Sequence, residues 1–302
     1  MNSARRPTIH FAGLLLALLI GSAASAFEPL PRATPDEQDV DPAALAAAFA
    51  DMEQLGYVRA MVVARNGLVL GEEHWQGTPE TPRQSRSVTK SVASALSGIA
   101  IEQGLIAEGL MARMVDYLPA DLVPADPAKH EIRIWHLLTM TSGFEWNEDT
   151  DVVPWLYGPD PVRDILSRPL AAPPGTIFNY NTAASHLLSV VLTEASEMST
   201  LEFADASLFG PLGITERHWV FTGGYPNGGH GLMLRTEDLA KLGVLFVNDG
   251  LWEDEPIVSS YWVYLATYPW IHNLGSMGPL TELEYGGLWW LGRAAGHRAF
   301  TA

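Results

Sequence analysis

Residues 86–104 read RSVTKSVASALSGIAIEQG, a stretch that combines a helical pattern with a reactive pair of residues. Its apolar residues recur at roughly helical spacing, at Val88, Val92, Ala95, Leu96 and Ile99. Gly104 follows them, as glycine often does just beyond the last turn of a helix. The pattern predicts one helix across this stretch.

Ser87 and Lys90 lie at the start of the predicted helix. A lysine three residues after a serine returns to the same helix face, one turn on. Burial and the positive helix end both lower a lysine pKa, so the amine can act as a base that activates the serine. The alternative is a serine cap followed by a solvated lysine. About one Ser-x-x-Lys is expected by chance in a chain of this size, so this stretch alone leaves both interpretations open.

The flanking sequence predicts an α+β fold. A first helix is expected over residues 41–56, and two strands joined by Asn66-Gly67 form the strongest short hairpin signal. Further helices are expected to begin at Thr182, as an N-cap, and at Thr236. Strand character returns in YGGLWWLG (285–292) and HRAFTA (297–302). This order predicts an antiparallel sheet built from both chain ends, with flanking helices and a helical insertion.

Composition restricts the function classes. The chain has 302 residues, 47% of them hydrophobic, enough for one large domain, and it shows no internal repeat or dividing linker. Its formal charge of −17 disfavours nucleic acid as a partner. The absence of cysteine excludes disulfides, thiol catalysis and cysteine-ligated zinc, and there is no H-E-x-x-H. We therefore expect neither a metal nor another cofactor.

The N-terminus has the order of a secretory signal peptide. Arg5 and Arg6 precede an apolar run over residues 11–20, and Ala24-Ser25-Ala26 stands before Phe27. We expect cleavage after residue 26, a periplasmic or secreted protein, and no stable membrane insertion afterwards. The alternative is an uncleaved anchor, although the apolar run is short for a membrane span.

Several blocks resemble, in order, the beta-lactamase-related serine hydrolases, from about Val58 to Ala302. They are SRSVTKSVASALSGIAIEQG, IRIWHLLTMTSGFEW, PPGTIFNYNTAASHLLSVVLTEAS, PLGI, GGHGLMLRTEDLAKLGVLFVNDG and YGGLWWLGRAAGHRAFTA. That group includes class C beta-lactamases, D,D-peptidases, esterases and 6-aminohexanoate-dimer (nylon-oligomer) hydrolases. The resemblance implies a beta-lactamase/transpeptidase-like fold.

The resemblance also implies roles for individual residues. Ser87 is then the acylated nucleophile, Lys90 its activating partner, and Tyr180 of the Tyr-x-Asn motif the residue that relays protons. The alternative for Tyr180 is an ordinary half-buried tyrosine before a helix. Thr182, a candidate substrate-binding residue, stands where beta-lactamases keep asparagine, which resembles the esterase and nylon-oligomer branch.

Other motifs are absent or weaker. Neither Ser-Asp-Asn nor Lys-Thr-Gly occurs, which disfavours a class A beta-lactamase. The G-x-S-x-G motif is also absent, which removes the usual α/β-hydrolase alternative. The GGYPNGGHG segment lacks the residues of a phosphate loop and is interpreted as a turn. Trp146, Trp155 and Tyr157 are candidates for the wall of a substrate pocket, with core packing as the alternative for most of them.

In the family, a third motif follows a segment like HRAFTA and provides the second oxyanion donor. Because this sequence stops at Ala302, we expect the C-terminal strands of the fold to be incomplete.

The sequence therefore predicts a signal peptide (1–26), a leader with the first helix (27–57) and a serine hydrolase domain (58–302). We expect cleavage of a small ester, amide or peptide through an acyl-enzyme. The alternatives are a penicillin-binding D,D-peptidase or class C beta-lactamase, and a catalytically inactive binding protein. The oligomeric state is left open.

Overall fold

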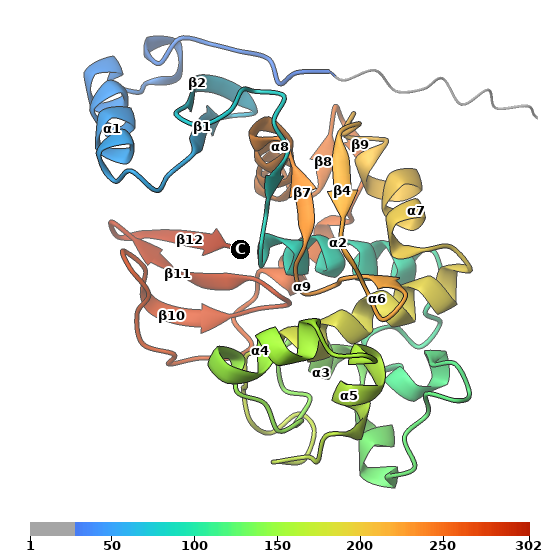
Figure 1. The fold of residues 1–302 in the computed structure, drawn as a ribbon. Coiled ribbons are helices and arrows are strands. Elements are labelled where there is room, and N and C mark those ends of the chain that lie inside the picture. Colours follow the sequence, from blue (N-terminus) through green and yellow to red (C-terminus); the bar gives the residue numbers. More distant parts are fainter. Residues whose placement is uncertain (1–27) are drawn as a thin grey trace, which may run out of the picture.

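The computed structural model describes residues 28–302, and Figure 1 shows their arrangement. The predicted signal peptide lies outside the described residues. Among the described residues, no helix has the length and apolar character needed to cross a membrane.

The N-terminal part consists of a helix and a hairpin at one end of the molecule (Figure 1). Helix α1 spans Pro42–Gln54, and the side chain of Asp41 caps it by accepting a hydrogen bond from the amide of Ala43. Strands β1 (Ala60–Arg65) and β2 (Leu68–His74) pair antiparallel. Asn66 and Gly67 both have positive φ, the backbone that a tight two-residue hairpin requires, so the predicted hairpin is confirmed.

Helices form most of the body. The remaining helices are α2 (Val88–Glu102), α3 (Ile134–Leu138), α4 (Glu148–Leu156), α5 (Pro161–Ser167), α6 (Thr182–Ser196), α7 (Thr200–Ala204), α8 (Thr236–Val247) and α9 (Ser260–Ala266). Helix α2 is buried over almost its whole length and packs against α6 and α9, so it forms the centre of the core. The helix predicted from the opening stretch is confirmed, with Gly104 at positive φ just beyond its end.

Two further helices begin where the sequence predicted, and one of them has a different capping residue. Helix α8 begins at Thr236 as predicted. Helix α6 also begins at Thr182, but the capping residue is Asn181 rather than Thr182. The Asn181 side chain accepts a hydrogen bond from the amide of Ala184 at 2.8 Å, which leaves the Thr182 hydroxyl available for other contacts.

The strands form several small antiparallel sheets. The C-terminal sheet has the order β10 (Thr281–Tyr285), β11 (Trp290–Ala294) and β12 (His297–Thr301). A second sheet has the order β3 (Arg83–Gln84), β7 (Leu232–Leu234) and β4 (Arg217–Trp219). Two short hairpins complete the set: β5 (Phe221–Thr222) with β6 (Tyr225–Pro226), and β8 (Leu251–Trp252) with β9 (Glu255–Pro256).

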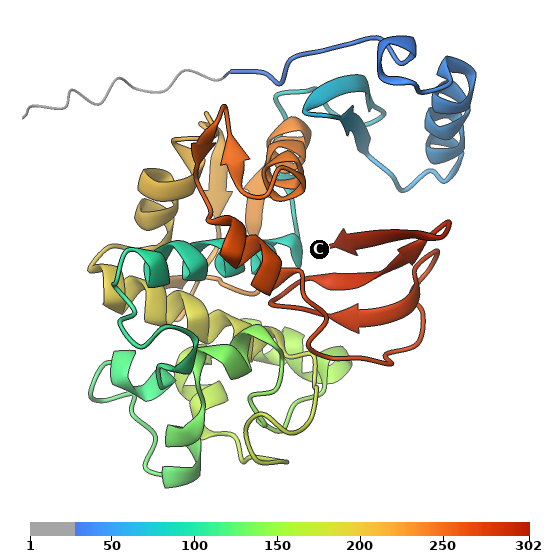
Figure 2. The same ribbon diagram turned by 180° about the vertical axis from the view of Figure 1, so that it is seen from behind.

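The α+β class with antiparallel strands is confirmed, and both ends of the chain contribute strands. In the described residues these strands form separate sheets, not the single sheet that the sequence predicted. The β1–β2 hairpin and the β10–β11–β12 sheet lie at the same side of the helical body (Figures 1 and 2). In residues 28–302 no ladder of hydrogen bonds joins them. A cavity of about 440 Å³ lies between the hairpin, α8 and β12, lined in part by Val62, Val244 and Phe300.

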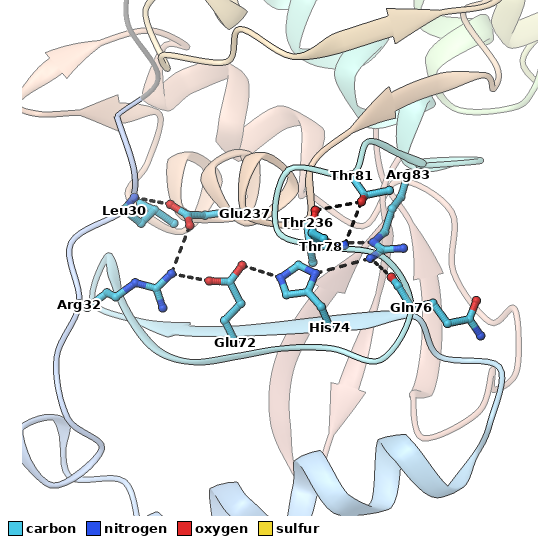
Figure 3. Close-up of polar contacts among 10 residues, drawn as sticks. All are labelled: Leu30, Arg32, Glu72, His74, Gln76, Thr78, Thr81, Arg83, Thr236 and Glu237. Atoms are coloured by element: carbon cyan, nitrogen blue, oxygen red, sulfur yellow. Dashed lines mark hydrogen bonds and ion pairs between the residues drawn. The ribbon is translucent and has the colours of Figure 1, made fainter.

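A polar network fastens the leader and the hairpin to α8 (Figure 3). Glu237, near the start of α8, accepts a hydrogen bond from the amide of Leu30 at 2.5 Å and pairs with Arg32 at 3.4 Å. Arg32 also pairs with Glu72 on β2, whose carboxylate contacts His74 at 2.8 Å. The leader is thus held by charge on a part of the fold distant from it in sequence.

Candidate active site

Ser87 lies at the entrance of α2, in a backbone that β3 and β7 fix. The amide and the hydroxyl of Ser85 both donate to the carbonyl of Leu232, each at 2.8 Å. Arg86 then takes a positive φ of 50°, which turns the chain into the helix. Ser87 occupies the capping position, yet its side chain makes no capping hydrogen bond. Its hydroxyl is therefore not used to satisfy the helix end.

The hydroxyl of Ser87 instead faces Lys90, whose Nζ lies 3.1 Å from Ser87 Oγ. Lys90 is 1% exposed, so the alternative of a solvated lysine does not describe it. Its ammonium donates to Thr182 Oγ1 at 2.9 Å and to the carbonyl of Gly229 at 2.8 Å. Burial lowers the pKa of Lys90 from 10.5 to about 8, while the charge of Glu148 acts in the opposite direction. A buried amine of lowered pKa beside a hydroxyl can accept the hydroxyl's proton.

The segment interpreted as a turn supplies one of these acceptors. The side chain of Asn227 accepts hydrogen bonds from the amides of Gly229 and His230, which curls the chain so that the Gly229 carbonyl faces Lys90. A Cβ at Gly229 would lie 2.6 Å from the carbonyl oxygen of Thr182. Only glycine therefore fits at this point of contact between the turn and α6.

Tyr180 brings a second titratable group to the same place. Lys90 Nζ lies 4.8 Å from the centroid of the Tyr180 ring. Burial raises the pKa of Tyr180 to about 12, and a hydrogen bond with Ser87 opposes this rise. The ring is stacked on Trp290 at 5.5 Å and meets Tyr285 edge-on at 6.2 Å, so it is held from the side of the C-terminal sheet.

Hydrogen bonds from α2 position the C-terminal sheet against the site. Ser91 donates to the carbonyl of Leu288 at 2.7 Å, and Ser94 donates to that of Gly287 at 2.6 Å. These acceptors belong to the YGGLWWLG segment, which carries Tyr285 and Trp290. The segment therefore contributes to strands β10 and β11 and also supports the ring of Tyr180.

Two residues that the sequence analysis did not single out also lie here. Glu148, the first residue of α4, accepts hydrogen bonds from the amide of Thr182 at 3.0 Å and from the hydroxyl of Thr182. His230, in the turn, lies close enough to Lys90 to feel its charge. Burial is the larger cause that lowers the pKa of His230, and the charge of Lys90 is the second. Glu148 stands in WNEDTDVVPWLYG (146–158), the segment that carries Trp146, Trp155 and Tyr157, and nothing in its sequence pattern places it opposite Thr182.

The three aromatic candidates for a pocket wall have different surroundings. Trp146 is buried beside the site and donates its Nε1 to Glu148 at 2.7 Å. Trp155 is 2% exposed and packs edge-on against His186 inside the core. Tyr157 is 86% exposed at the end of α4. The structure thus brings Ser87, Lys90, Tyr180, Thr182 and Trp146 together. Trp155 packs edge-on behind Trp146 at 6.1 Å, in the core, and Tyr157 lies away from the site at the surface. No group of histidines and carboxylates within residues 28–302 is arranged to hold a metal ion.

Comparison with known proteins identifies the family. The family model described as Beta-lactamase matches residues 43–302. No curated protein matches the chain.

Solved structures share the fold at low identity. A putative 6-aminohexanoate-dimer hydrolase from Bacillus anthracis is similar with a TM-score of 0.70 and 19% identity, covering 88% of this chain and 74% of its own. The octameric penicillin-binding protein homologue from Pyrococcus abyssi is similar with a TM-score of 0.68 and 18% identity, covering 86% of this chain and 67% of its own. EstCE1, a hydrolase with promiscuous acyltransferase activity, has a TM-score of 0.64 and 18% identity, and the match covers 84% of each chain.

The family match spans most of the chain, and the structural neighbours have the expected beta-lactamase/transpeptidase-like architecture. The chain therefore belongs to the beta-lactamase family, as the ordered motif blocks predicted.

Proposed function

We propose that this chain is a serine hydrolase that cleaves a small ester or amide through an acyl-enzyme. The observation that carries the proposal is the contact between Ser87 Oγ and the buried Lys90 Nζ at 3.1 Å. A hydroxyl is a weak nucleophile until a neighbouring base takes its proton, and Lys90 has the lowered pKa that such a base needs.

In the proposed reaction, Ser87 Oγ attacks the substrate carbonyl carbon while its proton moves to Lys90. The tetrahedral intermediate then expels the alcohol or amine, which takes a proton from Lys90 by way of the Tyr180 hydroxyl. Water hydrolyses the acyl-Ser87 ester by the same steps, which restores the serine. Because Tyr180 and Lys90 lie together, their protons are shared, and the pair handles both transfers as one unit.

The amide of Ser87, at the positive end of α2, is the proposed first oxyanion donor. The family resemblance places the second donor in the motif that follows a segment like HRAFTA. Thr301 of β12 pairs with Trp290, whose ring stacks on Tyr180, so the end of this strand approaches the site (Figure 2). This approach supports β12 as the strand that leads into that motif beside the site.

Thr182 favours the esterase and nylon-oligomer branch over the beta-lactamases. The structural neighbours described as a putative 6-aminohexanoate-dimer hydrolase and as a hydrolase with promiscuous acyltransferase activity agree with that choice. We propose further that residues 1–26 direct export, which a secreted reporter fused with and without these residues tests.

Labelling with a fluorophosphonate probe tests the proposal directly. We expect the purified chain to be labelled, Ser87→Ala to remain unlabelled, and p-nitrophenyl ester turnover to follow the labelling. Acylation by a beta-lactam without turnover would favour a D,D-peptidase instead, and rapid nitrocefin hydrolysis a beta-lactamase. A folded, soluble sample that is not labelled at Ser87 would contradict a serine hydrolase and favour an inactive binding protein.

A further inference from the structure

The carboxylate of Glu148 lies between the starts of two helices. Glu148 is the first residue of α4, and its Oε2 accepts hydrogen bonds from Trp146 Nε1 at 2.7 Å and from the amide of Thr182 at 3.0 Å. Thr182 is the first residue of α6, whose positive end favours a negative charge at this point. Oε2 is thus occupied by two donors, and Oε1 is left to accept from the hydroxyl of Thr182.

This arrangement decides which way the hydroxyl of Thr182 points. A hydroxyl has one proton, and Thr182 gives it to Glu148. Toward Lys90 the same oxygen can therefore only accept, over the 2.9 Å that separate it from Lys90 Nζ. The carbonyl of Gly229, 2.8 Å from Nζ, can also only accept.

A neutral lysine has two N–H donors and one lone pair. When Lys90 loses its proton, its donors go to Thr182 and to the Gly229 carbonyl, since neither of these can donate to it. The lone pair is then left for Ser87, the remaining partner within hydrogen-bond distance and one that has a proton to give.

We propose that Glu148 is a positioning residue that, through the Thr182 hydroxyl, directs the lone pair of Lys90 at Ser87 and sets how readily Lys90 releases its proton. The part that concerns the reaction rests on the proposed function. The part that concerns the orientation and protonation of Lys90 rests on the contacts alone.

The charges around Lys90 make Glu148 the group that matters for its titration. The titratable and charged groups around the site are Tyr180 before α6, Tyr285 of β10, His230 of the turn, Arg86 before α2, and Glu148 of α4. Of these, Glu148 is the charge that raises the pKa of Lys90. The pKa of Tyr180 is raised to about 12 and that of Tyr285 is raised as well, whereas the pKa of His230 is lowered. All three are neutral where Lys90 titrates. Arg86 contributes a positive charge, so Glu148 is the negative charge that acts to hold a proton on Lys90.

Glu148→Gln tests the inference because it keeps the shape and removes the charge. The oxygen of the new amide would face Trp146 and the Thr182 amide, so its NH₂ would donate to the Thr182 hydroxyl. The proton of Thr182 would then turn toward Lys90 and occupy the lone pair. We expect kcat/KM for a p-nitrophenyl ester to fall about 10- to 100-fold, which is less than the roughly 10²- to 10⁴-fold contribution of a general base, because Lys90 is kept and only its orientation is disturbed.

A double-mutant cycle separates positioning from a general structural effect. Thr182→Val removes the hydroxyl that transmits the effect and keeps the side chain's size. In that background we expect Glu148→Gln to cost less than about threefold, because neighbouring changes that act through one group are not additive. An undiminished loss from Glu148→Gln in the Thr182→Val protein would overturn the inference.

A second measurement does not depend on turnover. The sequence contains three lysines, Lys90, Lys129 and Lys241, so labelling lysine with ¹³C at Cε gives few NMR signals, and Lys90→Met assigns that of Lys90. We expect the midpoint of the Lys90 titration to be lower in Glu148→Gln than in the wild type. An unchanged midpoint would refute the role of Glu148 even if the enzyme is active. A lowered midpoint in a chain that no fluorophosphonate labels would support that role and reject the proposed reaction.

Discussion

Replacing Lys90 with methionine should remove activity and, at the same time, change how the stability of the fold depends on pH. Lys90 is 1% exposed, and burial lowers its pKa from 10.5 to about 8. Methionine has a similar length and fills the same space without a charge to bury. The comparison of the two proteins therefore isolates the cost of placing an ammonium in the core beside Ser87.

The size of this cost follows from the pKa. A fall from 10.5 to about 8 corresponds to roughly 3 kcal/mol, at about 1.4 kcal/mol for each pKa unit. Between pH 8 and 10.5 the unfolded chain keeps the lysine proton and the folded chain has released it. Since the unfolded state then binds more protons, the Lys90 contribution makes the wild type more stable as pH rises. The cost falls from roughly 3 kcal/mol at pH 7 to about 2 kcal/mol at pH 9.

Equilibrium unfolding in urea at pH 7, 8 and 9 measures the effect, with tryptophan fluorescence as the signal. The free energy of unfolding of Lys90→Met minus that of the wild type should decrease by roughly 1 kcal/mol from pH 7 to 9. Hydrogen bonds lost in the variant add an offset that does not depend on pH. Ser87→Ala, which keeps Lys90, should follow the wild type. A difference that stays constant across this range would refute the reasoning.

Two further predictions concern the surroundings of the site and the N-terminal leader. Gly229→Ala should lower ester kcat/KM by about 10- to 100-fold with the fold retained, because the new Cβ would press on Thr182 and displace the carbonyl that holds Lys90. Gly243→Ala in α8, where a Cβ meets nothing within 4 Å, is the matched control, and equal activity of the two variants would contradict the argument. Glu237→Gln should increase the rate of tryptic cleavage after Arg32 by about tenfold, since it weakens charged hydrogen bonds to Leu30 and Arg32. Gel analysis of a digestion time course checks this, with the exposed Glu253→Gln as control, and identical rates would show that the network does not hold the leader.

Local patterns were sufficient for much of the fold. The Asn66-Gly67 hairpin requires a backbone that these two residue types adopt at low cost, and helix α2 follows from an apolar repeat ended by a glycine. The cap of α6 shows the limit of such patterns. Asn181 and Thr182 are both good capping residues, and the choice between them depends on Glu148, which binds the Thr182 hydroxyl from another helix.

The candidate site divides in the same way. The local sequence pattern was enough to predict that Ser87 and Lys90 lie on one face at a helix start, because one helical turn separates them. The sequence also placed the chain in its family, because several motif blocks follow one another in the expected order. Whether that lysine is solvated or buried is not a local property. It was decided when the turn at Gly229, the start of α6 and the ring of Tyr180 closed around Nζ. Glu148 was beyond reach of the sequence for the same reason, since its partner Thr182 lies 34 residues away and only tertiary packing brings the two helix starts together.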